Sequence, residues 1–205
     1  LKSSRLVALL RKYKSVLLFI LTFLGSYLGF LVLYQGYLKW GGSQRYFPDY
    51  ITHMVARQSE LLIQAFGYEG RVTPSGVEAA MNLEISGVQL ARIIEGCNAI
   101  SVILLFISFL IAFWGGLKRT LLFMFAGAVL IYCINIFRIA ILTVGIYEYP
   151  AYANLLHGTV FPAIIYGLTF VLWITWVKFY SNLNRDKMDR KVRILVILVL
   201  FFALV

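Results

Sequence analysis

Long apolar runs constrain the fold of this chain more than any other feature. Four runs are long enough to cross a hydrocarbon core, which needs about 20 helical residues. They cover residues 16–38, about 94–114, 121 to about 146, and 159–177, and a fifth begins at Ile194. With 61% hydrophobic and 14% charged residues, the composition differs from that of a soluble domain. The sequence therefore predicts an all-α polytopic membrane protein, a helical bundle of at least five transmembrane spans.

The segments between the runs suggest one membrane-embedded domain over residues 1–205. Residues 39–93 form the longest of these segments and are expected to lie outside the bilayer. Because the chain begins at Leu1 and ends within a short apolar segment, we expect both termini to be truncated.

The 39–93 segment has periodic patterns of its own. A helix ending near Gly67 would place four apolar residues near one face: Ile51, Val55, Leu62 and Phe66. This pattern predicts an amphipathic helix lying at the membrane interface. Alternating polar and apolar residues about Ser86 and Gly87 predict a β-hairpin that leads into the second run.

The basic residues indicate an orientation in the membrane. Thirteen of the 19 lysines and arginines lie before the first run, between the second and third, and between the fourth and fifth. By the positive-inside bias these segments and the N-terminus are cytoplasmic, so the 39–93 loop faces the periplasm. The net charge of +10 is thereby explained as a topology signal with some attraction to anionic lipid head groups. It gives no reason to expect nucleic acid as a partner.

Several polar residues lie where the spans bring them to the same side of the membrane. Arg138 lies in the outer half of the third run, at a cost of about 3 kcal/mol on insertion scales, and Asn135 is one turn earlier on the same helical face. Cys97 begins the second run and His157 begins the fourth, and both runs start outside. A cysteine, an arginine and a histidine from three spans therefore meet toward the periplasm.

Each of these residues also has an ordinary structural explanation. A cysteine often only fills space, an interfacial histidine often only anchors a helix, and an arginine can pair with a carbonyl group or a lipid phosphate. Cys133, in the middle of the third run, is expected to be buried and to serve packing alone. The joint placement of the other three favours a site.

Nucleophilic acyl transfer is the chemistry that these three residue types can perform together. The Cys97 thiol would attack a carbonyl group, His157 would move the proton, and the Arg138 guanidinium would stabilise the oxyanion. We expect Cys97 at the N-terminus of a helix, where the helix dipole favours negative charge and the neighbouring Glu95 opposes it. His157 is expected at another helix N-terminus, close to a Gly158 carbonyl that Pro162 leaves free.

The ordered motifs "EGCNAI", "NIFRI" and "LLHG" resemble those of the exosortase/archaeosortase family of membrane cysteine transpeptidases. The resemblance covers about residues 85–175 and is closest to the exosortase F branch of Gram-negative bacteria. It implies that Cys97 is the nucleophile, with Arg138 and His157 as its catalytic partners; three neighbours are candidate supporting residues: Asn135, Glu95 and Asn98. Many members have Ala-Cys-Ser-Gly around the nucleophile, whereas this chain has Gly-Cys-Asn-Ala.

The resemblance also implies a substrate and a location. Clients would be membrane-anchored proteins with a C-terminal signal made of a short motif, a transmembrane helix and a basic cluster, processed at the outer face of the bacterial inner membrane. No cofactor and no metal are expected. Two alternatives remain open: a non-enzymatic transport or assembly subunit in which Arg138 binds an anion, and a lipid acyltransferase that uses the same Cys97 thiol.

Overall fold

The structure is a computed structural model that describes residues 13–40 and 47–180. Its longer helices are α2 (Lys14–Trp40), α3 (Tyr50–Ala65), α4 (Ile100–Ala112), α5 (Leu117–Glu148) and α7 (Phe161–Thr175). Short helical turns lie between and after them: η1 (Glu95–Cys97), η2 (Pro150–Tyr152), α6 (Ala153–Leu155), η3 (Leu156–Val160) and η4 (Trp176–Tyr180). The strands are β1 (Gly70–Pro74), β2 (Met81–Ile85) and β3 (Val88–Ile93).

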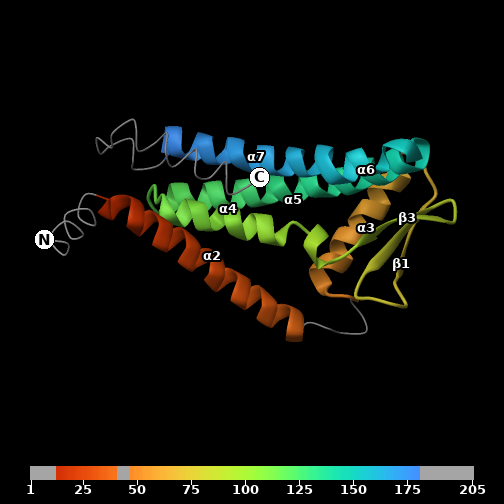
Figure 1. The fold of residues 1–205 in the computed structure, drawn as a ribbon, viewed down its shortest axis with the longest axis horizontal. Helices are drawn as coiled ribbons and strands as arrows, with labels where there is room; N and C mark the ends of the chain where they lie inside the picture. Colours follow the sequence, from red (N-terminus) through yellow and green to blue (C-terminus); the bar gives the residue numbers. More distant parts are fainter. Residues whose placement is uncertain (1–12, 41–46, 181–205) are drawn as a thin grey trace, which may run out of the picture.

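The helices and the sheet occupy different parts of the molecule. Figure 1 shows α4, α5 and α7 side by side, with α2 against α4 and diverging from it, while α3 and the sheet lie together at one end. The elements that carry Lys14, Lys118 and Lys178 begin or end at the opposite end. The end with these lysines, here called the lysine end, is therefore distinct from the sheet end, which contains the ion pairs Arg57–Glu60 and Arg92–Glu78.

Three described helical segments are long and apolar enough to cross a membrane: Lys14–Trp40, Leu117–Glu148 and Pro150–Tyr180. They contain the first, third and fourth runs of the sequence. The chain is thus a helical membrane protein in this part. The expected fifth span, from Ile194, lies outside the described residues.

The second run does not form the full span that was predicted over about 94–114. Helix α4 has only 13 residues, or about 20 Å, which is shorter than a hydrocarbon core of about 30 Å. The Asn98 side chain accepts a hydrogen bond from the Ile100 N–H at 3.0 Å, and Ala99 is left-handed with φ of 63°. Since an asparagine that binds nearby backbone competes with helix formation, the helix starts only after this turn.

Aromatic packing holds the helices together toward the lysine end of the bundle. Phe109 stacks on Trp173 with ring centroids 4.5 Å apart, and Phe23 meets Trp173 edge-on at 6.3 Å. Such pairs add about 0.5–1.5 kcal/mol each beyond the area that they bury. Helices α4 and α5 approach closely at Gly127, where a Cβ would lie 2.3 Å from the ring of Phe106.

Helix α3 is amphipathic, but its buried face differs from the predicted one. Residues buried on it are Thr52, Val55, Ala56, Ser59, Glu60 and Ile63. Phe66, which was expected on this face, is 44% exposed, and Ile51 and Leu62 are only partly buried. Small residues on the buried face let α3 pack between the sheet and α5. Contacts with the sheet and with α5 therefore decide which face of α3 is buried, and this face is not the most apolar one.

The three strands form one antiparallel sheet in the order β1-β2-β3. Strands β2 and β3 are joined by Ser86 and Gly87, both at positive φ (51° and 79°), the conformation that a two-residue hairpin turn requires. The central strand alternates, with Met81, Leu83 and Ile85 fully buried. These side chains pack with α3 and with the α5 segment that follows Arg138, which fixes the sheet beside that segment.

Candidate active site

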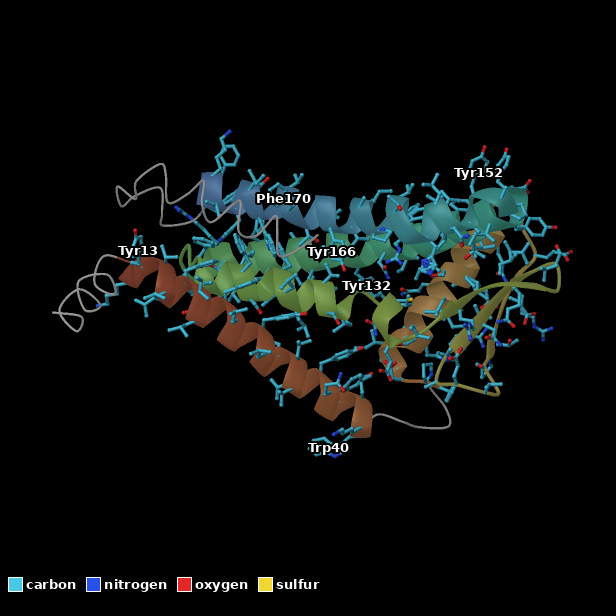
Figure 2. All side chains as sticks on the ribbon, viewed as in Figure 1. Tyr13, Trp40, Tyr132, Tyr152, Tyr166 and Phe170 are labelled. Carbon is cyan, nitrogen blue, oxygen red and sulfur yellow. The ribbon has the colours of Figure 1, made fainter. Side chains whose placement is uncertain are left out.

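A cavity of about 420 Å³ lies between β3 with its following turn, helix α5 and turn η3. Cys97, Arg138 and His157 all line it. They come from three segments separated by 19 residues or more, so their joint position is a result of the fold. The structure thus brings the three residues singled out as catalytic candidates to one partly open cavity. Its walls belong to elements near the sheet end of the bundle (Figure 1), and Figure 2 draws the described side chains on the same view.

Cys97 lies in a tight turn that precedes helix α4. It ends the 3-10 turn η1, and its N–H donates to the Ile94 carbonyl at 2.8 Å. The side chain is partly exposed and faces the cavity. The prediction that Cys97 begins the helix is therefore wrong, because the helix starts three residues later, at Ile100. The thiol therefore reaches the cavity wall from a turn that precedes the helix, and not from the helix itself.

Asn98 fixes this turn to the rest of the molecule. Its side chain is 1% exposed, and its Nδ2 donates to the Tyr34 hydroxyl at 2.7 Å and to Thr52 Oγ1 at 3.1 Å. Its Oδ1 holds the Ile100 N–H, as described above. One buried amide thereby ties the Cys97 turn to helices α2, α3 and α4. Its expected supporting role is consistent with this structural position.

Asn135 connects the cysteine turn to the arginine. It is fully buried, and its Nδ2 donates to the Cys97 carbonyl at 2.8 Å. Arg138 Nη1 donates to Asn135 Oδ1 at 3.4 Å, a long bond between residues one turn apart on the same face of α5. The guanidinium and the nucleophile's backbone are therefore positioned by a single intervening amide.

Arg138 has no carboxylate partner among residues 13–40 and 47–180, where the ion pairs are Arg57–Glu60 and Arg92–Glu78. Its Nε is buried and lacks a hydrogen-bond partner within the same residues. Arg92, which also lines the cavity, is neutralised by Glu78. Because an unpaired cation with a buried donor is costly, a bound anion or a developing oxyanion would find an unused partner here.

His157 faces the cavity from turn η3, a π-helical turn, and is exposed. The expected helix N-terminus lies elsewhere, since the helical segment already begins at Pro150. Pro162 has no N–H and cannot donate to the Gly158 carbonyl, which accounts for an irregular turn at this point. Single π-turns of this kind occur often at functional sites. In the described residues no hydrogen bond joins His157 to Cys97, and such bonds are often longer before substrate binds.

Glu95 stands two residues before the nucleophile. Partial burial, and to a lesser degree the charge of Asp49, raise the pKa of the Glu95 carboxyl above its ordinary value.

Cys133 is not buried as predicted. It is exposed on the outer surface of α5 rather than buried, so it does not fill a core position. It does not line the cavity. The outer surface of a membrane bundle is as apolar as its interior, and hydrophobicity alone therefore gives no measure of burial in such a helix.

Some residues of the site were not predicted from the sequence. Tyr34 and Thr52 hold Asn98 from 64 and 46 residues away. Leu142 and Ile146 complete the α5 wall of the cavity, one and two turns beyond Arg138. Only the helical spacing from Arg138 could have indicated these last two, because 3.6-residue periodicity places them on its face.

Comparisons with protein-family models, with curated proteins and with solved structures gave no match to this chain. The function must therefore be inferred from the cavity and the residues around it.

Proposed function

We propose that this chain is a membrane cysteine transpeptidase or peptidase of the exosortase kind, which cleaves C-terminal sorting signals of exported proteins. One observation carries the proposal: Cys97, Arg138 and His157 line one cavity although they come from separate segments. The exosortase-like motifs contain the same three residues. A thiol, a proton carrier and an unpaired cation are together what acyl transfer requires.

The reaction follows from the positions of these groups. His157 accepts the proton of the Cys97 thiol, and the thiolate attacks the carbonyl carbon of the scissile peptide bond. Arg138 stabilises the oxyanion of the tetrahedral intermediate, and its unpartnered Nε is an available donor. His157 then protonates the departing amine as the C–N bond breaks, which leaves the client's acyl group as a thioester on Cys97. An amine or water attacks the thioester, the product is released, and the thiol is restored.

In this mechanism, anchoring in the membrane brings the client's scissile bond close to the cavity. The cavity lies toward the sheet end of the bundle, opposite the end where Lys14, Lys118 and Lys178 are found. The positive-inside bias favours a sheet end on the side away from the cytoplasm. The resemblance to exosortases implies the bacterial inner membrane, which makes that side the periplasm. A client helix with basic residues on the cytoplasmic side would have its outer end at the depth of the cavity, so the scissile bond would be delivered at high effective concentration.

A second candidate is an anion-binding membrane subunit without enzymatic activity. The unpaired Arg138 favours it, since this residue would serve a bound anion equally well. This alternative requires Arg138 and has no use for the thiol. A lipid acyltransferase would need Cys97 but would leave client proteins uncut.

Client processing in cells separates these functions. The test uses a tagged protein from the same organism whose C-terminus is an apolar helix followed by a Lys/Arg cluster, and follows its size on gels. Cys97→Ala should abolish the size change at normal abundance of the enzyme. Cys133→Ala, the matched control, should leave it nearly unchanged, because Cys133 lies outside the cavity. Normal processing by Cys97→Ala would overturn the proposal and favour the anion-binding subunit.

A further inference from the structure

The two edge strands of the sheet, β1 and β3, have different surroundings. At the β1 edge, the Val72 N–H donates to Glu60 Oε1 at 2.9 Å, and Gln64 Nε2 donates to the Gly70 carbonyl at 2.9 Å. Both side chains come from helix α3. They satisfy backbone groups that point away from β2, so this edge is closed to another strand.

Within residues 13–40 and 47–180, no side chain covers the β3 edge in this way. Strand β3 pairs with β2 alone, and six consecutive residues, 89–94, line the cavity. A strand that touched the cavity only through side chains would contribute every second residue. Glu84 pairs with Gln89 and Leu83 with Ala91, so Leu90 lies unpaired at an irregularity that interrupts the alternation. The run continues beyond it through residues 91–94, so the cavity follows the backbone edge of β3 as well as its side chains.

The hairpin indicates which backbone groups are free. In a two-residue hairpin the flanking residues, here Ile85 and Val88, exchange both of their backbone hydrogen bonds. The next residue along β3 is Gln89, whose N–H and C=O therefore point away from β2. A donor and an acceptor are thus available at the point where the cavity begins.

The opposite wall is a helix face. Ile139, Leu142 and Ile146 of α5 line the cavity together with residues of β3. Cys97 lies four residues beyond the end of β3 and lines the same cavity. A peptide that follows β3 along the cavity therefore reaches the thiol.

We propose that the substrate binds as an added strand on β3, so that an extended peptide segment lies between β3 and α5 and leads its scissile carbonyl to Cys97. This inference rests on the proposed function and specifies how the substrate is recognised. Backbone hydrogen bonds to the open edge provide most of the binding, and alternate side chains meet the apolar α5 wall. The recognised segment is consequently extended, without proline at the bonded positions, and tolerant of sequence elsewhere.

Electrophilic peptides test the inference on the purified full chain. The first probe is a biotinylated Ala-Val-Ala-Val peptide ending in a vinyl sulfone, and the second is a vinyl sulfone joined to biotin by a flexible polyether. We expect the peptide to alkylate Cys97 on the order of tenfold faster, because several backbone hydrogen bonds form only with the peptide. N-methylation of successive amides in the peptide should slow labelling at alternate positions only.

Variants of Gln89 sharpen the test. Gln89→Pro removes the N–H at the open edge and should lose most of the peptide's advantage. Gln89→Ala keeps the N–H and should lose much less. The rate with the polyether probe shows whether Cys97 and its surroundings are intact in each variant, and the N-methyl series needs no variant at all.

The outcomes distinguish this inference from the proposed function. If both probes label Cys97 at one rate and N-methylation has no effect, strand addition is wrong while the reactive thiol remains. If neither probe labels Cys97 faster than Cys133, the proposed function fails, and strand addition fails with it.

Discussion

The two ends of the bundle are held together by different interactions. At the lysine end, rings such as Phe109 and Trp173 pack on one another, and their contacts lack direction beyond ring geometry. At the sheet end, the buried amides of Asn98 and Asn135 each hold named backbone or hydroxyl groups. Ring packing gives stability that many sequences could supply, whereas the amides fix a turn in one position. Chemistry is expected where positions are fixed.

The largest effect in this comparison should come from changing Arg138, the cation that lines the cavity. Arg138→Lys keeps the charge but loses the planar fork and its Nε donor, so client cleavage should fall about 100-fold or more. The rate of client cleavage in membranes measures it. Arg71→Lys, on the exposed part of β1, is the matched control. A near-normal rate for Arg138→Lys would show that charge alone is enough.

Asn98→Ala tests whether the amides position the site. It leaves the Tyr34 hydroxyl, Thr52 and the Ile100 N–H without their partner, at a cost of about 1–3 kcal/mol of stability. Cleavage should fall even at a temperature where the variant is fully folded, because the Cys97 turn is no longer held. Thermal unfolding and cleavage rates, taken together, measure both effects. An unfolding curve and a rate that are both unchanged would contradict the described role.

Gly127→Ala disturbs helix packing away from the cavity, so it should affect stability more than client cleavage. The added methyl group would lie 2.3 Å from the buried Phe106 ring, so helices α4 and α5 must separate slightly, at about 1–3 kcal/mol. Since the cavity is at the other end, cleavage by the folded variant should change less than about threefold. A loss of activity as large as that of Asn98→Ala would mean that the two ends are not independent.

The smallest effect concerns Glu95. Its pKa is raised in the folded protein, so the folded state keeps the proton to higher pH than the unfolded chain does, and ionisation lowers stability above that range. Glu95→Gln should therefore raise the Tm slightly at pH 7. The difference should shrink as pH falls and vanish below the ordinary pKa of about 4.5. Equal Tm values for both proteins from pH 4 to pH 8 would show that the carboxyl is not perturbed.

The coarse arrangement could be predicted from the sequence because it depends on length and charge. Uncharged runs locate the three membrane-length segments, and alternating direction along the chain places Cys97, Arg138 and His157 toward one end. These are local properties of the chain. They do not require knowledge of which helices are neighbours.

The finer errors have a common physical cause. The start of α4 depends on the turn in which Asn98 accepts from the Ile100 N–H, and bonds from Asn98 to Tyr34 and Thr52, which are distant in sequence, hold that turn in place. The buried stripe of α3 depends on the sheet that packs against it. The exposure of Cys133 depends on which side of α5 has neighbours. Tertiary contacts decide all three, and no local pattern reports them.

The covalent intermediate provides the most direct test of the central claim. Client and enzyme are mixed, the reaction is stopped with acid within seconds, and peptides of the enzyme are examined by mass spectrometry with and without hydroxylamine, which cleaves thioesters. We predict a hydroxylamine-sensitive adduct with the mass of the client's acyl fragment on the peptide that contains Cys97, and none on the peptide that contains Cys133. Client cleavage without any adduct on Cys97, or with an adduct on Cys133, would contradict the account.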